Sequence, residues 1–238
     1  MRVRKYIPDF ITSMNAVCGI VGVVHAFNGC YEAAFLLMLA AAVFDFCDGL
    51  AARALDAYSD FGKELDSLCD CISFGVLPSV MLYCLSHEYT ASKWVSATAL
   101  LIAVFSALRL AKFNVDKRQS ESFLGLPTPA CAMLVGALCC YIAKDPSTFL
   151  AIWVSGPVFV PALSVILCAL LVCEVPMFSL KMHKDDPQPL KNKRLAFAFI
   201  IIAAVIVCFA CRLDWSVAIV LVLSCYIIKN LIYRLFGV

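Results

Sequence analysis

Eight apolar segments, each long enough to cross a lipid bilayer, take up most of this 238-residue chain. A membrane-spanning helix needs about 20 mostly apolar residues. Apolar residues make up 63% of the sequence, whereas a soluble domain contains roughly 45–50%. We therefore predict an all-α polytopic membrane bundle. Its expected spans are 10–27, 31–53, 64–87, 94–113, 128–144, 148–173, 195–212 and 215–236.

The distribution of Lys and Arg predicts how the bundle is oriented. If the N-terminus is cytosolic, only Lys93, Lys144 and Arg212 of the 19 Lys and Arg residues fall on the opposite side. Cytosolic loops of membrane proteins carry the excess of positive charge. We therefore expect an integral membrane protein with cytosolic termini, located in the cytoplasmic membrane if the cell is prokaryotic. A net charge of +2 without a basic patch excludes nucleic acid as an expected partner.

The chain reads as a single domain. No linker or low-complexity stretch divides residues 1–238, and the one extended polar segment, 181–194, is typical of a cytosolic loop. The 14 cysteines are scattered through the expected spans without the spacing of a zinc site, so we interpret them as small buried apolar residues.

Four aspartates flank the junction between the second and third segments. Asp45 and Asp48 are three residues apart, so they project from one face of a helix. Asp66 and Asp70, four apart, do the same on the next helix. The polar stretch 53–62 predicts a turn that brings both pairs together at the cytosolic membrane edge. A charge in the bilayer costs roughly 2.5–3.5 kcal/mol, so these carboxylates imply a cation, a polar cavity, or both.

The ligand type indicates which cation. Carboxylates without His or Cys select hard divalent ions, so we expect Mg²⁺ or Mn²⁺. Two such ions bridged by carboxylates form the usual clamp for phosphoryl transfer. We therefore predict two divalent ions held by the four aspartates.

Small residues follow the first two aspartates. Gly49 and Ala52 lie one turn after Asp45 and Asp48, where a short side chain lets a nucleotide approach the helix. Arg53 could hold a phosphate, pair with an aspartate, or anchor the helix at the membrane edge. With Gly62, the whole pattern is D-x-x-D-G-x-x-A-R-x8-G-x3-D-x3-D, which resembles the signature of the CDP-alcohol phosphotransferases.

This resemblance implies roles for the aspartates. It implies metal and diphosphate ligands at Asp45, Asp48 and Asp66. Asp70, next to these ligands at the metal site, would be the general base that takes a proton from the attacking alcohol. It also implies a six-helix core, here about 7–181, to which the two spans over 195–236 are added, and a homodimer.

The start of the first span carries a second, partial resemblance. Residues 8–12, P-D-F-I-T, are similar to the family's P-N-x-x-T opening, which lies near the nucleotide, but Asp9 replaces the usual asparagine. Thr12 and Asn15 are therefore candidate contacts of CDP-diacylglycerol. The alternative is that they form hydrogen bonds to another helix, as Thr and Asn commonly do in membranes.

Three segments indicate the alcohol. Residues 107–114 (A-L-R-L-A-K-F-N), 123–130 (F-L-G-L-P-T-P-A) and 175–181 (V-P-M-F-S-L-K) resemble the membrane-bound phosphatidylserine synthases. A zwitterionic amino acid needs a cation for its carboxylate and acceptors for its ammonium group. The candidate serine-binding residues are Arg109, Lys112, Asn114 and Thr128. Anchoring at the cytosolic face is the alternative for the two basic residues.

The expected function is the transfer of the phosphatidyl group from CDP-diacylglycerol to L-serine in membrane lipid, at a site facing the cytosol. The same chemistry with another alcohol, glycerol 3-phosphate or inositol phosphate, is the first alternative. A divalent-cation transporter is the second, because acids in membrane segments also mark ion paths. A purely structural membrane protein is the third.

Overall fold

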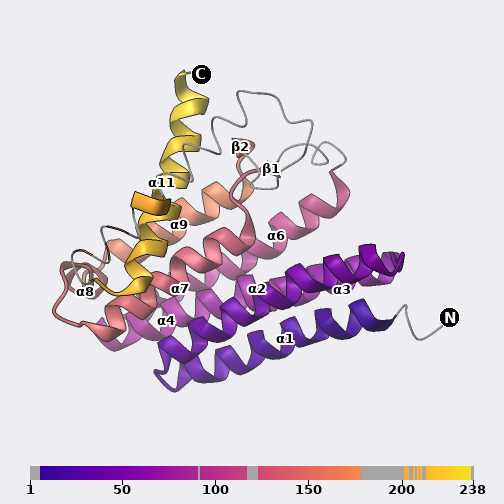
Figure 1. Cartoon of the computed structure of the whole chain (residues 1–238). Coiled ribbons are helices and arrows are strands. Elements are labelled where there is room, and N and C mark those ends of the chain that lie inside the picture. The colour runs from indigo at the N-terminus through magenta and orange to yellow at the C-terminus, as the bar shows by residue number, and fades with distance from the viewer. Residues whose placement is uncertain are drawn as a thin grey trace.

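The described part of the protein is a bundle of helices with one pair of very short strands. The computed structural model describes residues 6–90, 92–116, 123–177, 201–203, 206, 208, 210 and 213–236. The first half contains α1 (Tyr6–Phe27), α2 (Tyr31–Ala54), α3 (Asp60–Asp70), α4 (Leu77–Tyr89), α5 (Lys93–Ala97) and α6 (Leu101–Val115). The second half contains α7 (Thr128–Lys144), α8 (Phe149–Ser155), α9 (Phe159–Val172) and α11 (Trp215–Phe236). Helix α1 lies along α2, and α11 packs on α7 in a different direction from the other long helices (Figure 1).

The predicted membrane bundle is confirmed, but the count of eight spans is not. Among the described residues, five helical stretches are long and apolar enough to cross a bilayer, and the bent pair of α7 and α8 would make a sixth. The five are Tyr6–Phe27, Tyr31–Ala54, Asp60–Tyr89, Lys93–Val115 and Trp215–Ile232. The span expected at 195–212 lies largely outside the described residues.

The prediction of one helix over 148–173 is wrong. Helix α8 ends at Ser155 and bends by 105° from α7, and α9 begins only at Phe159. Gly156 between them is extended, with φ −76° and ψ 156°. It precedes Pro157, whose ring disfavours the helical conformation of the residue before it. The apolar composition of this segment therefore does not produce a continuous helix.

Many large apolar side chains lie on the outside of the bundle, and several polar side chains are buried inside it beside the apolar core. Phe10 and Ile20 on α1 are exposed, whereas Thr12 and Asn15 on the same helix are buried. Lipid tails are as apolar as the helix surfaces, so the hydrophobic effect does not drive helices together in a membrane. Close packing at small residues and polar contacts between helices hold them together instead. A Cβ at Gly19 would overlap the Ser73 hydroxyl, so α1 lies directly against the helical turn that precedes α4.

The described cysteines are free thiols, most of them buried or half-buried.

A π-helical turn, Cys71–Val76, joins α3 to α4 within one continuous span. It begins at the residue after Asp70 and includes Ser73, the residue that contacts α1. Turns of this kind are frequent at functional sites. The fourth aspartate of the motif is therefore fixed at a change of helical geometry that packs against α1.

Two segments that resemble the phosphatidylserine synthases pair with each other. The strands β1 (Phe123–Leu124) and β2 (Pro176–Met177) are antiparallel. After β1, Gly125 N donates to Val175 O over 2.9 Å, and Leu126 N donates to Leu170 O over 2.8 Å. This contact fixes the start of α7 on the C-terminal end of α9.

Replacing Gly125 by Ala should destabilise the fold. Gly125 has φ +77°, and a Cβ there would lie 2.8–3.0 Å from three backbone carbonyl oxygens at the end of α9. Left-handed backbone at a residue with a side chain costs about 1–3 kcal/mol, before the clash is counted. We expect a lower melting temperature in detergent. In the control Gly49→Ala, the new methyl group meets no atom within 4 Å, so its melting temperature should not fall. An unchanged melting temperature for Gly125→Ala would contradict this prediction.

Candidate active site

Three of the four motif aspartates converge between α2 and α3. Asp45 and Asp48 come from α2, and Asp66 comes from α3. Each of the three offers one carboxylate oxygen, and these oxygens lie within 4.8 Å of one another. The predicted juxtaposition of the two helices therefore exists, with three carboxylates in a group that could hold a metal ion.

The turn between α2 and α3 is built by local signals. Helix α2 ends at Ala54, and Asp56 takes the left-handed conformation with φ 47°. Ser59 then caps α3, and its hydroxyl accepts a hydrogen bond from Gly62 N over 2.9 Å. The polar stretch expected to form a turn thus reverses the chain and sets the two aspartate pairs against each other.

Helix α1 forms the third wall of the site. Thr12 Oγ1 donates to Asp48 Oδ2 over 2.6 Å, and Asn15 Nδ2 donates to Asp70 Oδ1 over 3.1 Å. The Ser73 hydroxyl in turn donates to the Asn15 carbonyl oxygen over 2.9 Å. The two polar residues expected to contact CDP-diacylglycerol therefore each hold a motif carboxylate.

The three converging carboxylates fit a hard divalent cation. Asp66 Oδ1 is buried and has no hydrogen-bond partner among the described residues. Asp45 and Asp48 are both within electrostatic range of Asp66. Carboxylates this close repel one another unless a cation or a proton offsets their charge. Asp70 stands outside the group of three but within electrostatic range of all its members.

A cavity of about 580 Å³ opens beside the aspartates, between α1, α2 and α3. Asp48 and Asp66 contribute to its wall, together with Thr12. Gly49 and Ala52 also line it, and a Cβ at Gly49 would have no atom within 4 Å. The small residues of the motif therefore leave room for a ligand next to the carboxylates.

The cavity wall is closely packed around Gly62. A Cβ at this position would lie 3.0 Å from both Asp9 Oδ1 and Ser59 Oγ. Asp9, which departs from the family's usual asparagine, lines the same cavity. The glycine of the motif thus allows the start of α3 to lie close to α1.

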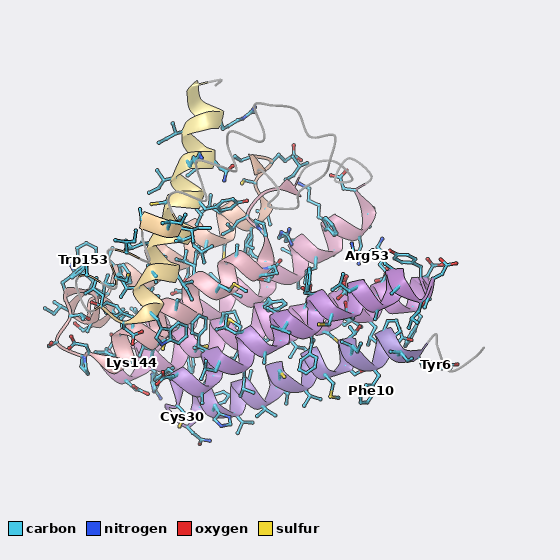
Figure 2. The ribbon with its side chains drawn as sticks, in the orientation of Figure 1. Tyr6, Phe10, Cys30, Arg53, Lys144 and Trp153 are labelled. Atoms are coloured by element: carbon cyan, nitrogen blue, oxygen red, sulfur yellow. The ribbon has the colours of Figure 1, made fainter. Side chains whose placement is uncertain are left out.

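Arg53 does not line this cavity. It is exposed, and its Nε donates to the Gly49 carbonyl oxygen over 3.0 Å, one turn earlier on α2. Figure 2 shows it at the end of the bundle where Tyr6 also lies, with Cys30 and Lys144 at the other end. Of the three roles considered for Arg53, the geometry favours anchoring of the helix at the membrane edge.

A second group of polar residues is buried between α6 and α7. Arg109 is 7% exposed, and its Nη1 donates to Thr128 Oγ1 over 2.8 Å. The guanidinium lies 5.8 Å from the centre of the Phe113 ring, and Asp70 is within its electrostatic range. Its buried Nε has no partner among the described residues. Two of the four residues expected to bind serine, Arg109 and Thr128, therefore form a pair, and the Arg109 Nε donor has no partner among the described residues.

Lys112 and Asn114 contact residues away from that pair. Lys112 Nζ lies 3.1 Å from Glu174 Oε1, an ion pair that joins α6 to the segment before β2. Asn114 Nδ2 donates to Ser67 Oγ over 2.8 Å and so joins α6 to α3. The structure thus brings Arg109 and Thr128 together but not all four candidates.

The sequence analysis did not identify some residues of the site. Ser59 and Lys63 line the aspartate cavity, and Glu174 is the partner of Lys112. Lys63 carried a usable signal, since it follows Gly62 directly and lies three residues before Asp66 on the same helix. The sequence around Glu174 carried no signal that identifies Lys112 as its partner.

Comparison with known proteins identifies the family. The sequence profile of the CDP-alcohol phosphatidyltransferase family matches residues 5–161. The chain belongs to this family. The match runs from the start of α1 into α9 and contains the whole aspartate site together with Arg109 and Thr128.

Several similar phosphatidyltransferases have assigned activities. A CDP-diacylglycerol–serine O-phosphatidyltransferase of Bacillus subtilis is 38% identical over 129 residues, which are 54% of this chain and 72% of the relative. One from Mycobacterium leprae is 33% identical over 236 residues, covering 94% of this chain and 73% of the relative. An archaetidylserine synthase of Methanothermobacter thermautotrophicus is 35% identical over 135 residues, covering 55% and 56%.

Membership of the phosphatidyltransferase family makes this chain a membrane-integral phosphotransferase. The transporter and the purely structural interpretation are not favoured. The position of the aspartates agrees with this, because they lie on two adjacent helices rather than along several spans.

Proposed function

We propose that this enzyme transfers the phosphatidyl group of CDP-diacylglycerol to the hydroxyl of L-serine, which yields phosphatidylserine and CMP. The relatives named as serine phosphatidyltransferases support this acceptor, and one of them aligns with 94% of the chain. The observation that carries the proposal is the buried Arg109, bound to Thr128 and within electrostatic range of Asp70. A fixed cation within electrostatic range of a base suits an amino acid that has both a carboxylate and a reactive hydroxyl.

The donor is assigned to the cavity between α1, α2 and α3. Its volume of about 580 Å³ and its small residues suit a nucleotide diphosphate, with the acyl chains in the surrounding lipid. Of the proposed donor-side residues, Thr12, Gly49, Ala52 and Gly62 line this cavity. Asn15 and Arg53 do not line it, so Asn15 would act by holding Asp70, and Arg53 by anchoring the end of α2 at the membrane edge. Asp45, Asp48 and Asp66 would hold Mg²⁺ or Mn²⁺, two ions by analogy with other phosphoryl-transfer sites, which neutralise the charge of the diphosphate.

The acceptor is assigned to the surroundings of Arg109. The unused Nε of Arg109 is a donor for the serine carboxylate, and Thr128 keeps the guanidinium in place. Thr128 or a motif carboxylate would accept a hydrogen bond from the serine ammonium group. Lys112 and Asn114 support this site by holding α6 to the segment before β2 and to α3.

Asp70 is assigned as the general base. Asn15 holds its Oδ1, so the other carboxylate oxygen can take the proton of the serine hydroxyl. The serine oxygen then forms a bond to the β-phosphorus, the bond from that phosphorus to the bridging oxygen breaks, and CMP leaves with the electron pair. Holding donor and acceptor in line supplies much of the rate.

The site is assigned to the cytosolic side, and the enzyme is proposed to be a homodimer. The orientation is supported by two basic residues near the aspartates: Arg53 follows them on α2, and Lys63 lines the cavity with Asp48 and Asp66. Lys144 lies at the other end of the bundle from Arg53, paired with Glu32 and Asp214. The homodimer rests on family resemblance alone.

The acceptor is tested by measuring CMP release from CDP-diacylglycerol by purified protein in detergent with Mg²⁺ or Mn²⁺. We expect release to depend on L-serine and not on glycerol 3-phosphate or inositol phosphate. Both of these carry a phosphate group with up to two negative charges, and Arg109 is the one buried cation among the described residues, so it would offset only part of that charge. A reaction without any alcohol corrects for hydrolysis. Release supported by either phosphorylated alcohol instead of serine would overturn the proposed acceptor while leaving the chemistry intact.

A further inference from the structure

Lys63 is a basic residue of the donor cavity to which no role has been given. It lies in the first turn of α3, directly after Gly62, and its side chain is exposed. It lines the cavity together with Asp48 and Asp66. Its Nζ donates to the Asn114 carbonyl oxygen over 3.2 Å. Because an ammonium group has three donors, that contact leaves two for a ligand.

Lys63 is important for the binding of an anion because the other charged residues of the cavity wall are acids. Among the described residues that line the cavity, the carboxylates belong to Asp9, Asp48, Asp60 and Asp66, and Lys63 is the one basic residue. A diphosphate is repelled by such acids wherever no cation lies between them. A charge-assisted hydrogen bond from an ammonium group to a phosphate oxygen is among the strong ones. An anion in this cavity is therefore attracted to the wall that carries Lys63.

We propose that Lys63 binds a phosphate of the donor's diphosphate. This inference rests on the proposed function, because it assumes that a nucleoside diphosphate occupies the cavity. The same ammonium group contacts Asn114 at the end of α6, the helix that carries Arg109. Lys63 thus joins the donor cavity to the helix assigned to the acceptor.

A purely structural role would have different consequences. If Lys63 only joined α3 to α6, its loss would lower stability and would affect all ligands alike. As a phosphate ligand, it discriminates between ligands with and without phosphates. Arginine in its place keeps a cation within reach, although without the compact point charge of lysine.

The test compares Lys63→Met and Lys63→Arg with wild type. CDP and cytidine binding are measured by calorimetry in detergent, with and without Mg²⁺, and KM is measured for CDP-diacylglycerol and for serine. For Lys63→Met we expect CDP affinity to fall and the KM for CDP-diacylglycerol to rise, each about 10- to 100-fold. Cytidine affinity, serine KM and melting temperature should not change, and Lys63→Arg should recover most of the loss. Lys93→Met is the matched control, because Lys93 is an exposed lysine at the start of α5 and away from the cavity.

Two results would overturn the proposal. One is wild-type CDP affinity in Lys63→Met. The other is an equal loss of CDP and cytidine binding together with a lower melting temperature, which identifies a structural contact. The CDP measurement needs no acceptor. If the wild-type enzyme uses another alcohol but Lys63→Met still loses CDP selectively, only the proposed acceptor fails, and the role of Lys63 stands.

Discussion

Replacing Asp70 by Asn should lower the rate of CMP release about 100- to 10,000-fold, the range that general base catalysis contributes. Asp70 is 9% exposed, and Asn15 donates a hydrogen bond to its Oδ1. An asparagine has nearly the same shape and can still accept that bond through its amide oxygen, so the site should stay assembled. It cannot take a proton from the serine hydroxyl. Single-turnover CMP release at saturating serine, with CDP affinity measured in parallel, checks this.

The matched control for Asp70→Asn is Asp56→Asn. Asp56 lies in the turn between α2 and α3, is exposed, and has a left-handed φ of 47°, which asparagine also tolerates. It should keep wild-type activity. If Asp70→Asn instead loses CDP affinity and needs much more Mg²⁺ or Mn²⁺, Asp70 acts mainly as a metal ligand and the assignment of the base is wrong.

Removing divalent ions should abolish CMP release, and Asp66→Asn should make the enzyme far harder to reactivate. Asp66 is one of the three carboxylates within 4.8 Å of one another, and its buried Oδ1 has no partner among the described residues. Losing a residue that merely supports a metal ligand costs about 10- to 100-fold in metal affinity, and losing a ligand should cost at least as much. The measurement is a titration of Mg²⁺ and Mn²⁺ into chelator-treated protein, with CMP release as the readout.

Glu64→Gln serves as the control for Asp66→Asn. Glu64 is an exposed acid on the same helix, and it belongs neither to the group of three nor to the cavity wall. Its half-maximal metal concentration should equal that of wild type. Full activity of the wild-type enzyme after exhaustive chelation would show that the three carboxylates do not need a metal ion.

The sequence was sufficient for the first four spans and for the convergence of Asp45, Asp48 and Asp66, because both depend on local spacing. Apolar length predicts a span, and carboxylates at i, i+3 and i+4 share a helix face whatever surrounds them. The polar stretch between Arg53 and Gly62 predicted the reversal that sets Asp66 opposite Asp45 and Asp48. Local spacing did not reveal that Gly156 and Pro157 interrupt the sixth segment, although both residues commonly end helices.

At the proposed acceptor site, local sequence patterns did not determine which residues contact one another. Arg109 and Lys112 are three residues apart on α6, yet Arg109 binds Thr128 whereas Lys112 binds Glu174. Asn114, two residues further on, contacts Ser67 on α3. All three were plausible ligands of one carboxylate, because the sequence shows which polar residues are near the end of α6 but not which neighbours approach them.

The sequence by itself determined a helical membrane bundle, the approach of Asp66 to Asp45 and Asp48 between α2 and α3, and the small residues that open the wall beside them. The tertiary structure decided which polar side chains complete the site. Thr12 reaches Asp48 across 36 residues, Asn15 reaches Asp70 across 55, and Lys112 reaches Glu174 across 62. Helix periodicity and the demands of a bilayer act on residues within a turn or a span, so a sequence displays them directly. The partners of a buried polar group depend on how separate helices pack, and that packing is set by the whole chain at once.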